Sequence, residues 1–406
     1  MVKSKSVTPL YSINQALNMV NCCLSGTFAT NYLKQQAGAT NSQSGIVISV
    51  SNIFCFVLGI SLSSLIDKNR RFNVAKIIPC MIVLQIASCV VLSVFPNNAP
   101  LAYVSYAAFS TFSGIVSPLL LKFYADMAHG GFVLDFGVAR GIASAAFVIT
   151  SAVSGKVAEK VSVSVFPKIA IATGILNLIS HFVLCRQVMG KAKHETVEEE
   201  EGSTLGQFVS SNPRFCLLLA GIACIFVGHY FSCNFLINVV NNLGSDNGIM
   251  GLLSGFMALT EVPVMMCFAK IKKGRDTRNL LKMSFIFFGL KCLAVALAPN
   301  IPLLFAAFIL QAPSFALYTP LIVEYVKETL PHRDSGKAQS MAYGMLSLGQ
   351  VIAGFVAGNL YDNMSVSQTL LIGAAVALFG TALSLLGLKK PKNDQDSAAV
   401  AGQTAF

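Results

Sequence analysis

Long apolar segments recur along the whole of this chain, and each is long enough to cross a lipid bilayer. A membrane-spanning helix needs about 20 mostly apolar residues, whereas a strand of a membrane barrel needs about 10 residues of alternating polarity. Twelve continuous segments meet the first requirement, at approximately 10–32, 43–65, 75–95, 100–123, 135–157, 166–187, 214–239, 248–269, 279–298, 301–326, 337–360 and 367–388. The sequence therefore predicts an all-α membrane protein with twelve transmembrane helices.

The composition supports a membrane protein and argues against an enzyme. Hydrophobic residues make up 54% of the 406 residues and charged residues only 12%, against about 25% charged in soluble domains. The sequence contains no glycine-rich phosphate-binding loop and no cysteine or histidine cluster with metal-ligand spacing. Its eleven cysteines are scattered through apolar segments, which is typical of small buried hydrophobic residues. We therefore expect no enzymatic activity, no cofactor and no bound metal.

The net charge of +11 is concentrated on one side of the expected membrane. If the N-terminus is cytoplasmic, most of the 29 lysines and arginines fall in cytoplasmic segments, and only Lys34, Lys156, Lys160 and Lys168 fall in outside loops. That asymmetry follows the positive-inside rule, with both termini cytoplasmic. The basic residues are thus explained by the lipid bilayer, and we expect no nucleic-acid partner. The first apolar segment is long and carries several asparagines, which is unlike a cleavable signal peptide.

One long polar segment, 188–213, divides the chain into two halves of six helices each. We expect a cytoplasmic linker there, between an N-terminal bundle at 1–187 and a C-terminal bundle at 214–390, with a disordered cytoplasmic tail at 391–406. An internal repeat supports this division: DFGVAR at 135–140 returns as DSGKAQ at 334–339, and Gly155 is matched by Gly354 at the same offset. Halves repeated in parallel are typical of transporters that rock about a central site.

Three charged residues lie inside predicted spans: Glu261 and Lys291 near the middle of theirs, and Arg140 about a turn and a half from the cytoplasmic end of its span. A charge at the centre of a spanning helix costs about 2.5 to 3.5 kcal/mol, so such residues normally face a wet cavity or an opposite charge. We expect Glu261 and Lys291 to pair, with a purely structural ion pair as the alternative to a functional one. For Arg140, and for Lys122 near another helix end, the alternative is a side chain that reaches the lipid surface.

Polar stripes at helical spacing indicate faces that line a cavity or pack against another polar helix. Asn14 and Asn18 form one stripe in the first segment, and Tyr343 belongs to another in the eleventh. His229 in the seventh segment could carry protons or could simply hydrogen-bond a neighbouring helix.

Several motifs resemble the major facilitator superfamily, and within it the branch that contains lactose permease and the phenylpropionate and nucleoside permeases. GISLSSLIDKNRR at 59–71 resembles the gating motif between helices two and three, which implies that Asp67 and Arg71 are ion-pairing parts of a gate. Asp135, at the start of DFGVAR, is placed with these gating residues. The stretch 310–362 resembles the branch closely through helices ten and eleven. The resemblance implies the major facilitator fold, with two pseudo-symmetric six-helix bundles.

Two further motifs imply substrate-binding residues. DFGVARGIASAAF resembles the start of the fifth helix of lactose permease, so that Arg140 stands at the family's sugar-binding arginine and Phe147 at a stacking aromatic residue. TEVPVM at 260–265 resembles a helix-eight element of the phenylpropionate-permease branch, which places Glu261 at the sugar-binding glutamate. Lys291 takes the place of a buried arginine in helix nine.

Three departures from the family pattern change the expected chemistry. The family glutamate one helix before the arginine is Lys122 here, its helix-ten histidine is Gln311, and its proton-carrying carboxylate is Ser314. Because Gln311 and Ser314 cannot titrate, we expect Glu261 to carry the coupling proton, with Lys291 setting its affinity for that proton. A second cation at position 122, beside the family arginine, would attract anions.

The sequence thus predicts a secondary active transporter that moves a small organic solute by alternating access, as a monomer in the cell (inner) membrane. The expected reaction is proton-coupled uptake, with a lean towards an organic acid. A neutral sugar or nucleoside proton symporter is the first alternative, and a multidrug exporter or a non-transporting sensor is the second. The expected substrate-binding residues are Asn14, Asn18, Lys122, Arg140, Phe147, Glu261, Gln311 and Tyr343.

Overall fold

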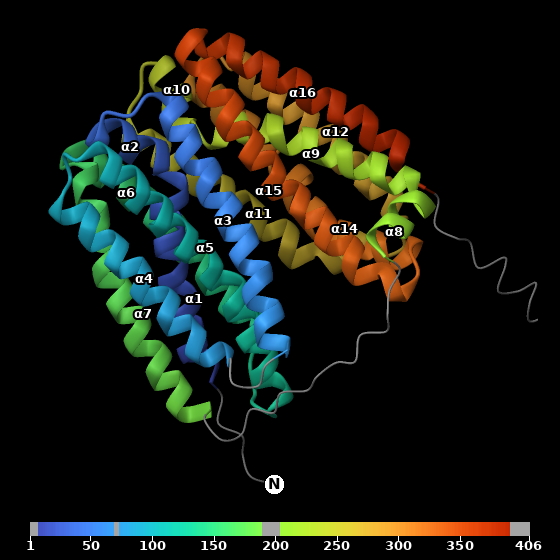
Figure 1. Ribbon diagram of the computed structural model, residues 1–406. Coiled ribbons are helices and arrows are strands. Elements are labelled where there is room, and N and C mark those ends of the chain that lie inside the picture. The colour runs from blue at the N-terminus through green and yellow to red at the C-terminus, as the bar shows by residue number, and fades with distance from the viewer. Residues whose placement is uncertain (1–6, 69–72, 189–203, 390–406) are drawn as a thin grey trace, which may run out of the picture.

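A computed structural model describes residues 7–68, 73–188 and 204–389. Long helices dominate the described residues and gather into an N-terminal and a C-terminal bundle (Figure 1). The expected tail at 391–406 lies outside the described residues.

The N-terminal bundle contains the first six predicted spans. Its elements are α1 (Thr8–Cys22), a π-helical turn η1 (Cys23–Thr27), α2 (Ala29–Ala37), α3 (Asn41–Lys68), α4 (Val74–Val94), α5 (Ala99–His129), α6 (Phe136–Lys160), the short 3₁₀ turn η2 (Val163–Val165) and α7 (Phe166–Val188). Asparagine or aspartate side chains cap the N-termini of α4, α5 and α6, where they accept hydrogen bonds from otherwise unpaired backbone N–H groups.

The C-terminal bundle contains the last six spans. Its elements are α8 (Leu205–Ser211), α9 (Pro213–Cys233), α10 (Leu236–Asn242), α11 (Asn247–Lys272), α12 (Thr277–Leu297), α13 (Ile301–Ile309), a π-helical turn η3 (Ala312–Ala316), α14 (Leu317–Thr329), α15 (His332–Asn363) and α16 (Val366–Gly387). The short helix α8 lies within the predicted linker, so the described part of 188–213 is not all irregular.

Eleven helices among the described residues are long and apolar enough to cross a membrane. The twelfth predicted span, 10–32, is present but broken, because η1 separates α1 from α2. A similar π-helical turn, η3, interrupts the tenth span between α13 and α14. Irregular backbone at membrane depth is tolerated where it is buried in protein or lines a cavity, so both interruptions mark places to look for a site.

The two bundles meet through two pairs of helices, α3 with α15 and α6 with α11. Glycines allow both contacts: an added Cβ on Gly155 would lie 2.8 Å from the Cα of Gly251, and one on Gly354 would collide with Ser49. Gly155 and Gly354 are the matched glycines of the internal repeat. The repeat therefore places equivalent close contacts on both sides of the interface between the bundles.

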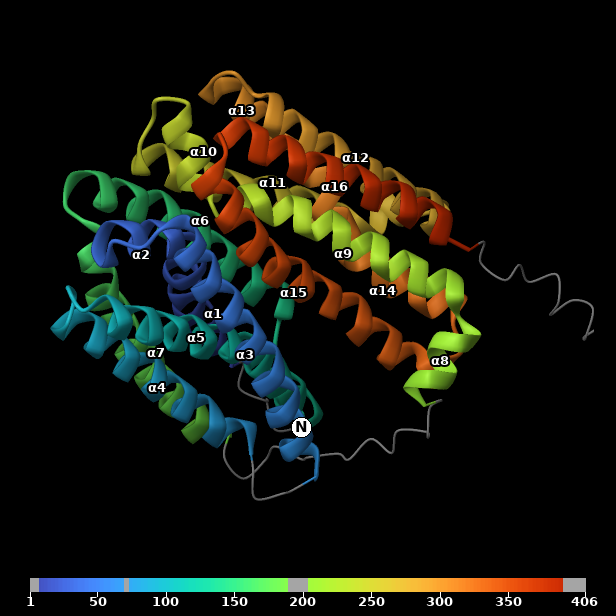
Figure 2. The same ribbon diagram turned by 45° about the horizontal axis from the view of Figure 1, so that its top comes forward.

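The bundles touch at one end of the molecule, which we call the closed end. There Asp362 of α15 accepts hydrogen bonds from the backbone N–H groups of Asn41 and Ser42 at the start of α3, at 2.9 and 2.8 Å. Lys34 donates to Asn41 and to Asn238 of the other bundle. Towards the opposite end, where α7 ends and α8 lies, α3 and α15 diverge (Figure 1; Figure 2). We call this the linker end.

Candidate functional site

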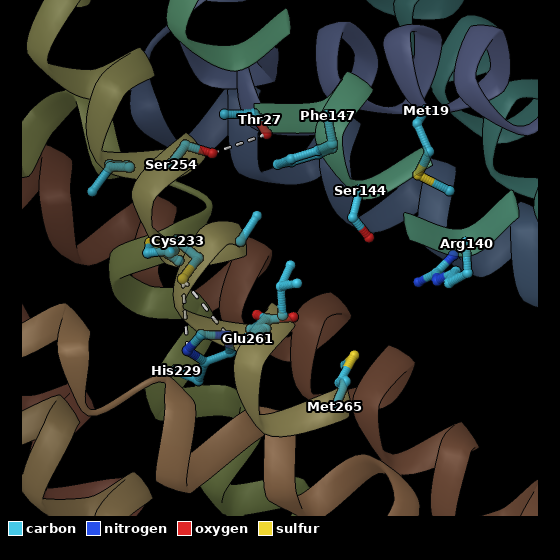
Figure 3. A pocket seen from close by; sticks show the side chains of 14 residues that line it. Met19, Thr27, Arg140, Ser144, Phe147, His229, Cys233, Ser254, Glu261 and Met265 are labelled. Carbon is cyan, nitrogen blue, oxygen red and sulfur yellow. Dashed lines mark hydrogen bonds between the residues drawn. The ribbon is translucent and has the colours of Figure 1, made fainter. Parts of the chain in front are cut away.

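A cavity of about 320 Å³ lies between the two bundles, and we call it the central cavity (Figure 3). Helices α1 and α6 and the turn η1 form its N-terminal wall, and α9, α10 and α11 form its C-terminal wall. Its lining consists of Met19, Thr27, Arg140, Ser144, Phe147, His229, Cys233, Leu236, Ser254, Met257, Ala258, Glu261, Val262 and Met265. Side chains from both bundles therefore share one site, as a rocking transporter requires.

Helix α6 presents Arg140, Ser144 and Phe147 to the central cavity (Figure 3). Residues four and seven positions apart lie on the same face of a helix, which explains why one short motif supplies all three. The side chain of Arg140 is exposed, and it forms no ion pair with any residue that the structure describes. The structure thus places Arg140 and Phe147 in the cavity, where the sequence predicted them.

Helix α11 presents Met257, Glu261 and Met265, at intervals of four residues, on the facing wall. The hydroxyl of Ser151 on α6 donates to the carbonyl of Gly251 on α11 at 2.8 Å, so the two helices are in contact near the closed end. Glu261 lies further along α11 and points into the space between the helices (Figure 3). The central cavity therefore occupies the gap that opens between α6 and α11 beyond their glycine contact.

A chain of hydrogen bonds leads from Glu261 away from the cavity. The side-chain amide of Gln311 donates to Glu261 Oε1 at 2.8 Å, and Gln311 Oε1 accepts from Lys291 Nζ at 2.7 Å. Lys291 is only 1% exposed, and its ammonium also lies 4.5 Å from the ring centroid of Phe288. The expected direct pair of Glu261 with Lys291 is therefore wrong: Gln311, from the interrupted tenth span, separates the two charges.

The other end of this chain is His229, which sequence reasoning left between two roles. Lys291 Nζ lies 3.0 Å from His229 Nδ1, and because an ammonium can only donate, this nitrogen accepts and carries no proton. The ring also contacts Cys233 Sγ, one helical turn away, and both residues line the cavity. The sequence analysis did not predict Cys233 as a lining residue. Its spacing of four from His229 places both on one helix face, but that spacing is equally typical of residues that only pack against another helix.

The N-terminal asparagines are elsewhere. Asn14 donates to Ser180 Oγ and contacts His181 Nδ1 on α7, while Asn18 donates to Ser117 Oγ on α5. Both asparagines are fully buried and neither lines the central cavity. Their helical spacing is real, but it marks a face that packs against α5 and α7, because each amide nitrogen donates a hydrogen bond there.

Three more predicted binding residues do not line the central cavity. Gln311 is one of them, because it lies behind Glu261 and bonds it. Lys122 is half-buried on α5, and Tyr343 on α15 is 42% exposed. A stripe or a motif fixes a residue's helix and face, but the tilt of that helix decides whether the face reaches the cavity. Arg140 is thus the cation that the structure places at the site, without Lys122 beside it.

The predicted gating residues have different outcomes. Arg71 and the side chain of Asp67 lie outside the described residues. Asp135 caps the N-terminus of α6: its side chain accepts from the N–H of Val138 at 3.0 Å, and its own N–H donates to Thr8 Oγ1. Helix capping therefore explains why Asp135 begins the DFGVAR motif. The cap fixes where α6 begins, and so fixes the position of Arg140 in its second turn.

Comparisons with known proteins agree with this architecture. A solved structure of a mutant of the nucleoside transporter NupG superposes with a TM-score of 0.78, at 14% identity, over 94% of this chain and 100% of that chain. A solved structure of an auto-inhibited POT family peptide transporter gives 0.76, at 11% identity, over 95% and 98%. Identities this low show a shared fold only. A putative sugar efflux transporter of Deinococcus radiodurans is 29% identical over 159 residues, which is 39% of this chain and 40% of that relative.

Two helical bundles around a cavity that both of them line are the arrangement expected of a membrane transporter. The sequence model of the "MFS_1 like family" matches residues 20–372, and the chain belongs to this family. Its fold is therefore that of the major facilitator transporters, as the sequence predicted, and the protein is a multi-pass membrane transporter rather than an enzyme.

Proposed function

We propose that this protein takes up a small organic acid together with a proton, using the central cavity as the shared site. One observation carries the proposal: among the described residues, the lining holds a single arginine or lysine, Arg140, and a single carboxylate, Glu261, on facing helices. Because Arg140 forms no ion pair within the described residues, its guanidinium is available to a ligand.

The chemistry of the N-terminal wall suits a carboxylate. A guanidinium can hold a carboxylate through two parallel hydrogen bonds, which a point charge such as an ammonium cannot do. Phe147 lies two turns along the same face and offers a ring for an apolar or aromatic body. An acid with a compact organic body would therefore contact both Arg140 and Phe147.

Coupling to a proton follows from the charge balance of the lining. With Glu261 ionised, its negative charge faces an incoming anion and opposes binding. With Glu261 protonated, Arg140 is the remaining charge on the described lining, and an anion is attracted. Proton and anion binding would therefore strengthen each other by the same factor, since coupling between two ligands is reciprocal. Lys291, held through Gln311, would set the proton affinity of Glu261.

Transport requires that the closed end and the linker end open alternately. The glycine contacts and the Asp362 cap close one end, and the cavity lies on the other side of them. If both termini are cytoplasmic, as the positive-inside rule predicts, this conformation faces the cytoplasm. We further propose that the protein acts as a monomer in the cell membrane, as its resemblance to the permease branch implies.

A neutral sugar or nucleoside is the second candidate. It is favoured by the names of the sugar efflux and nucleoside transporters that the chain resembles. Glu261 could also accept hydrogen bonds from sugar hydroxyls in place of binding a proton. The relative is named a sugar efflux transporter, and a protein with that role would export its substrate rather than take it up.

Competition in liposomes distinguishes these candidates. Purified protein in liposomes with a pH gradient should concentrate a radiolabelled carboxylate that does not cross lipid unaided, such as glucuronate, whereas protein-free liposomes should not. Other carboxylates should compete with it. Glucose and uridine at the same concentration should not compete. If the protein takes up glucose or uridine and carboxylates do not inhibit that uptake, the organic acid is rejected as substrate and the neutral sugar or nucleoside is favoured.

A further inference from the structure

A second, smaller cavity lies beside the central one, and we call it the side pocket. Its volume is about 150 Å³, and its lining consists of Cys22, Ser25, Gly26, Ala29, Ile48, Ser51, Asn52, Cys55, Ser110, Gly114 and Gln350. These residues come from the first span, α3, α5 and α15. No lining residue is shared with the central cavity.

The interrupted first span borders both cavities. Met19 and Thr27 line the central cavity, whereas Cys22, Ser25 and Gly26 line the side pocket. These positions lie on adjacent faces of one helix, at the same depth. The π-helical turn η1 (Cys23–Thr27) contributes residues to both cavities, as expected of irregular backbone that lines functional space inside a membrane.

The side pocket is polar but carries no charged side chain among the described residues. Asn52 uses its amide nitrogen to bond the carbonyl of Ile48, which leaves its amide oxygen for the pocket. Within the described part of the chain, neither Gln350 nor Ser110 has a hydrogen-bond partner. A polar side chain without a partner at membrane depth costs free energy, so these groups call for a ligand or for water.

The two bundles share the side pocket. Gln350 belongs to α15, and every other lining residue belongs to the N-terminal bundle. The adjacent α3–α15 contact, in which Ser49 Oγ donates to the carbonyl of Val351 at 2.7 Å, holds Gln350 over the pocket. Separation of α3 from α15 would remove Gln350, so the pocket changes with the same motion that opens the closed end.

We propose that the side pocket is a second part of the substrate site and binds a neutral group that carries hydroxyls or amides. This inference rests on the proposed function. A volume of about 150 Å³ equals that of roughly five water molecules, enough for a small hydroxylated fragment. The substrate class is then an acid with a polyhydroxylated part, such as a sugar acid, whose carboxylate binds Arg140 and whose hydroxyls extend past Gly26 to Gln350.

Gly26 offers a way to fill the pocket without disturbing the fold. An added Cβ there meets no heavy atom within 4 Å, and Gly26 is not among the glycines with positive φ, so an L-residue fits the backbone. Gly206 on α8 is the control position, because its Cβ also meets nothing within 4 Å and it lines neither cavity. Gly26→Val and Gln350→Leu are the test variants, and Gly206→Val is the control.

The experiment measures equilibrium binding of glucuronate, benzoate and glucose to the purified proteins. Gly26→Val and Gln350→Leu should each weaken glucuronate binding by about tenfold, the usual consequence of leaving a buried polar group without its partner. Benzoate binding should stay within about twofold in all variants, since an acid without hydroxyls does not need the pocket. Gly206→Val should bind all three compounds like the wild type.

The outcomes separate this inference from the proposed function. Unchanged glucuronate binding in both test variants, or equal weakening of glucuronate and benzoate, would overturn the side pocket as a subsite. If the wild type binds glucose but neither acid, the proposed organic acid fails, and glucose then tests the pocket with the same variants. No binding of glucuronate or glucose to the wild type would also overturn the inference.

Discussion

The two bundles bury polar side chains in different ways. In the N-terminal bundle, Asn14 and Asn18 bond Ser180 and Ser117 and join neighbouring helices by neutral hydrogen bonds, away from the central cavity. In the C-terminal bundle, the chain from Glu261 through Gln311 to Lys291 is charged at both ends, and Glu261 reaches the cavity.

This difference indicates which buried polar residues of a membrane protein stabilise its fold and which serve transport. Neutral amides and hydroxyls form hydrogen bonds between neighbouring helices, and a single atom such as Asn18 Oδ1 can remain without a partner. Each such bond contributes on average about 0.6 kcal/mol. A buried charge costs more and is retained where it has a use. We therefore expect variants of the C-terminal chain to change transport and variants of the N-terminal network to change stability.

The largest effect is expected from Glu261→Gln. Glutamine still accepts a hydrogen bond from Gln311 but cannot bind a proton at neutral pH, so accumulation should be lost while exchange of substrate persists. A one-unit pH gradient can support about tenfold accumulation with one proton per substrate, and this ratio should fall to one in the variant.

The matched control for this prediction is Glu324→Gln. Glu324 pairs with Lys272 and Lys327 near the linker end and does not line the central cavity, so accumulation should remain. Accumulation that survives Glu261→Gln and disappears in Glu324→Gln would move the proton carrier out of the central cavity.

Asn14→Leu should come next and should act on stability. It leaves the partner groups on Ser180 and His181 without Asn14, in a fully buried position, which costs roughly 1–3 kcal/mol. The melting temperature of the purified protein should fall, while substrate affinity per folded molecule stays constant. A large loss of affinity at an unchanged melting temperature would return Asn14 to the binding site, where sequence reasoning placed it.

Asp362→Asn tests the contact that holds the two bundles together at the closed end. Asparagine has one acceptor oxygen in place of two, and one of the bonds to the N–H groups of Asn41 and Ser42 is lost. A cost of about 1 kcal/mol corresponds to roughly a fivefold shift towards opening. A cysteine introduced at the buried Ser44 should then react faster with a thiol reagent. Unchanged reactivity would show that the glycine contacts close this end without the cap.

Asn18→Ala should have the smallest effect. Removing its bond to Ser117 should lower stability by about 0.6 kcal/mol, which is a shift of a few degrees or less in melting temperature. Substrate uptake should not change. A loss of uptake comparable to that in Glu261→Gln would remove the distinction between the two networks.

The sequence predicted the helices well because the bilayer sets their length, and the predicted spans agree with the structure to within a few residues at most boundaries. It also placed Arg140, Phe147 and Glu261 correctly at one cavity. The two charges were found because charges at membrane depth need such surroundings, and Phe147 was found through the family resemblance. The π-helical turns had no clear signal in hydropathy.

The rest depended on how helices are rotated and tilted against each other. Gln311 lies between Glu261 and Lys291 only because three separate helical segments meet there, and spacing along one helix cannot show this. The stripe of Asn14 and Asn18 predicted a face towards a cavity or towards another helix, and their hydrogen-bond partners on α5 and α7 show that it faces other helices. Lys122 and Tyr343 do not line the cavity, because the rotation of their helices turns them away from it and the sequence does not give that rotation.

Equilibrium binding to Arg140 variants tests the central claim most directly. Calorimetric titration of the purified protein with benzoate and glucuronate should show binding that Arg140→Gln weakens by about 10- to 100-fold, the range for lost hydrogen bonds to a charged group. Arg140→Lys should recover only part of this, because an ammonium does not hold a carboxylate by two parallel bonds. Carboxylate binding that is equal in the wild type and Arg140→Gln would contradict the account, as would binding of glucose or uridine alone.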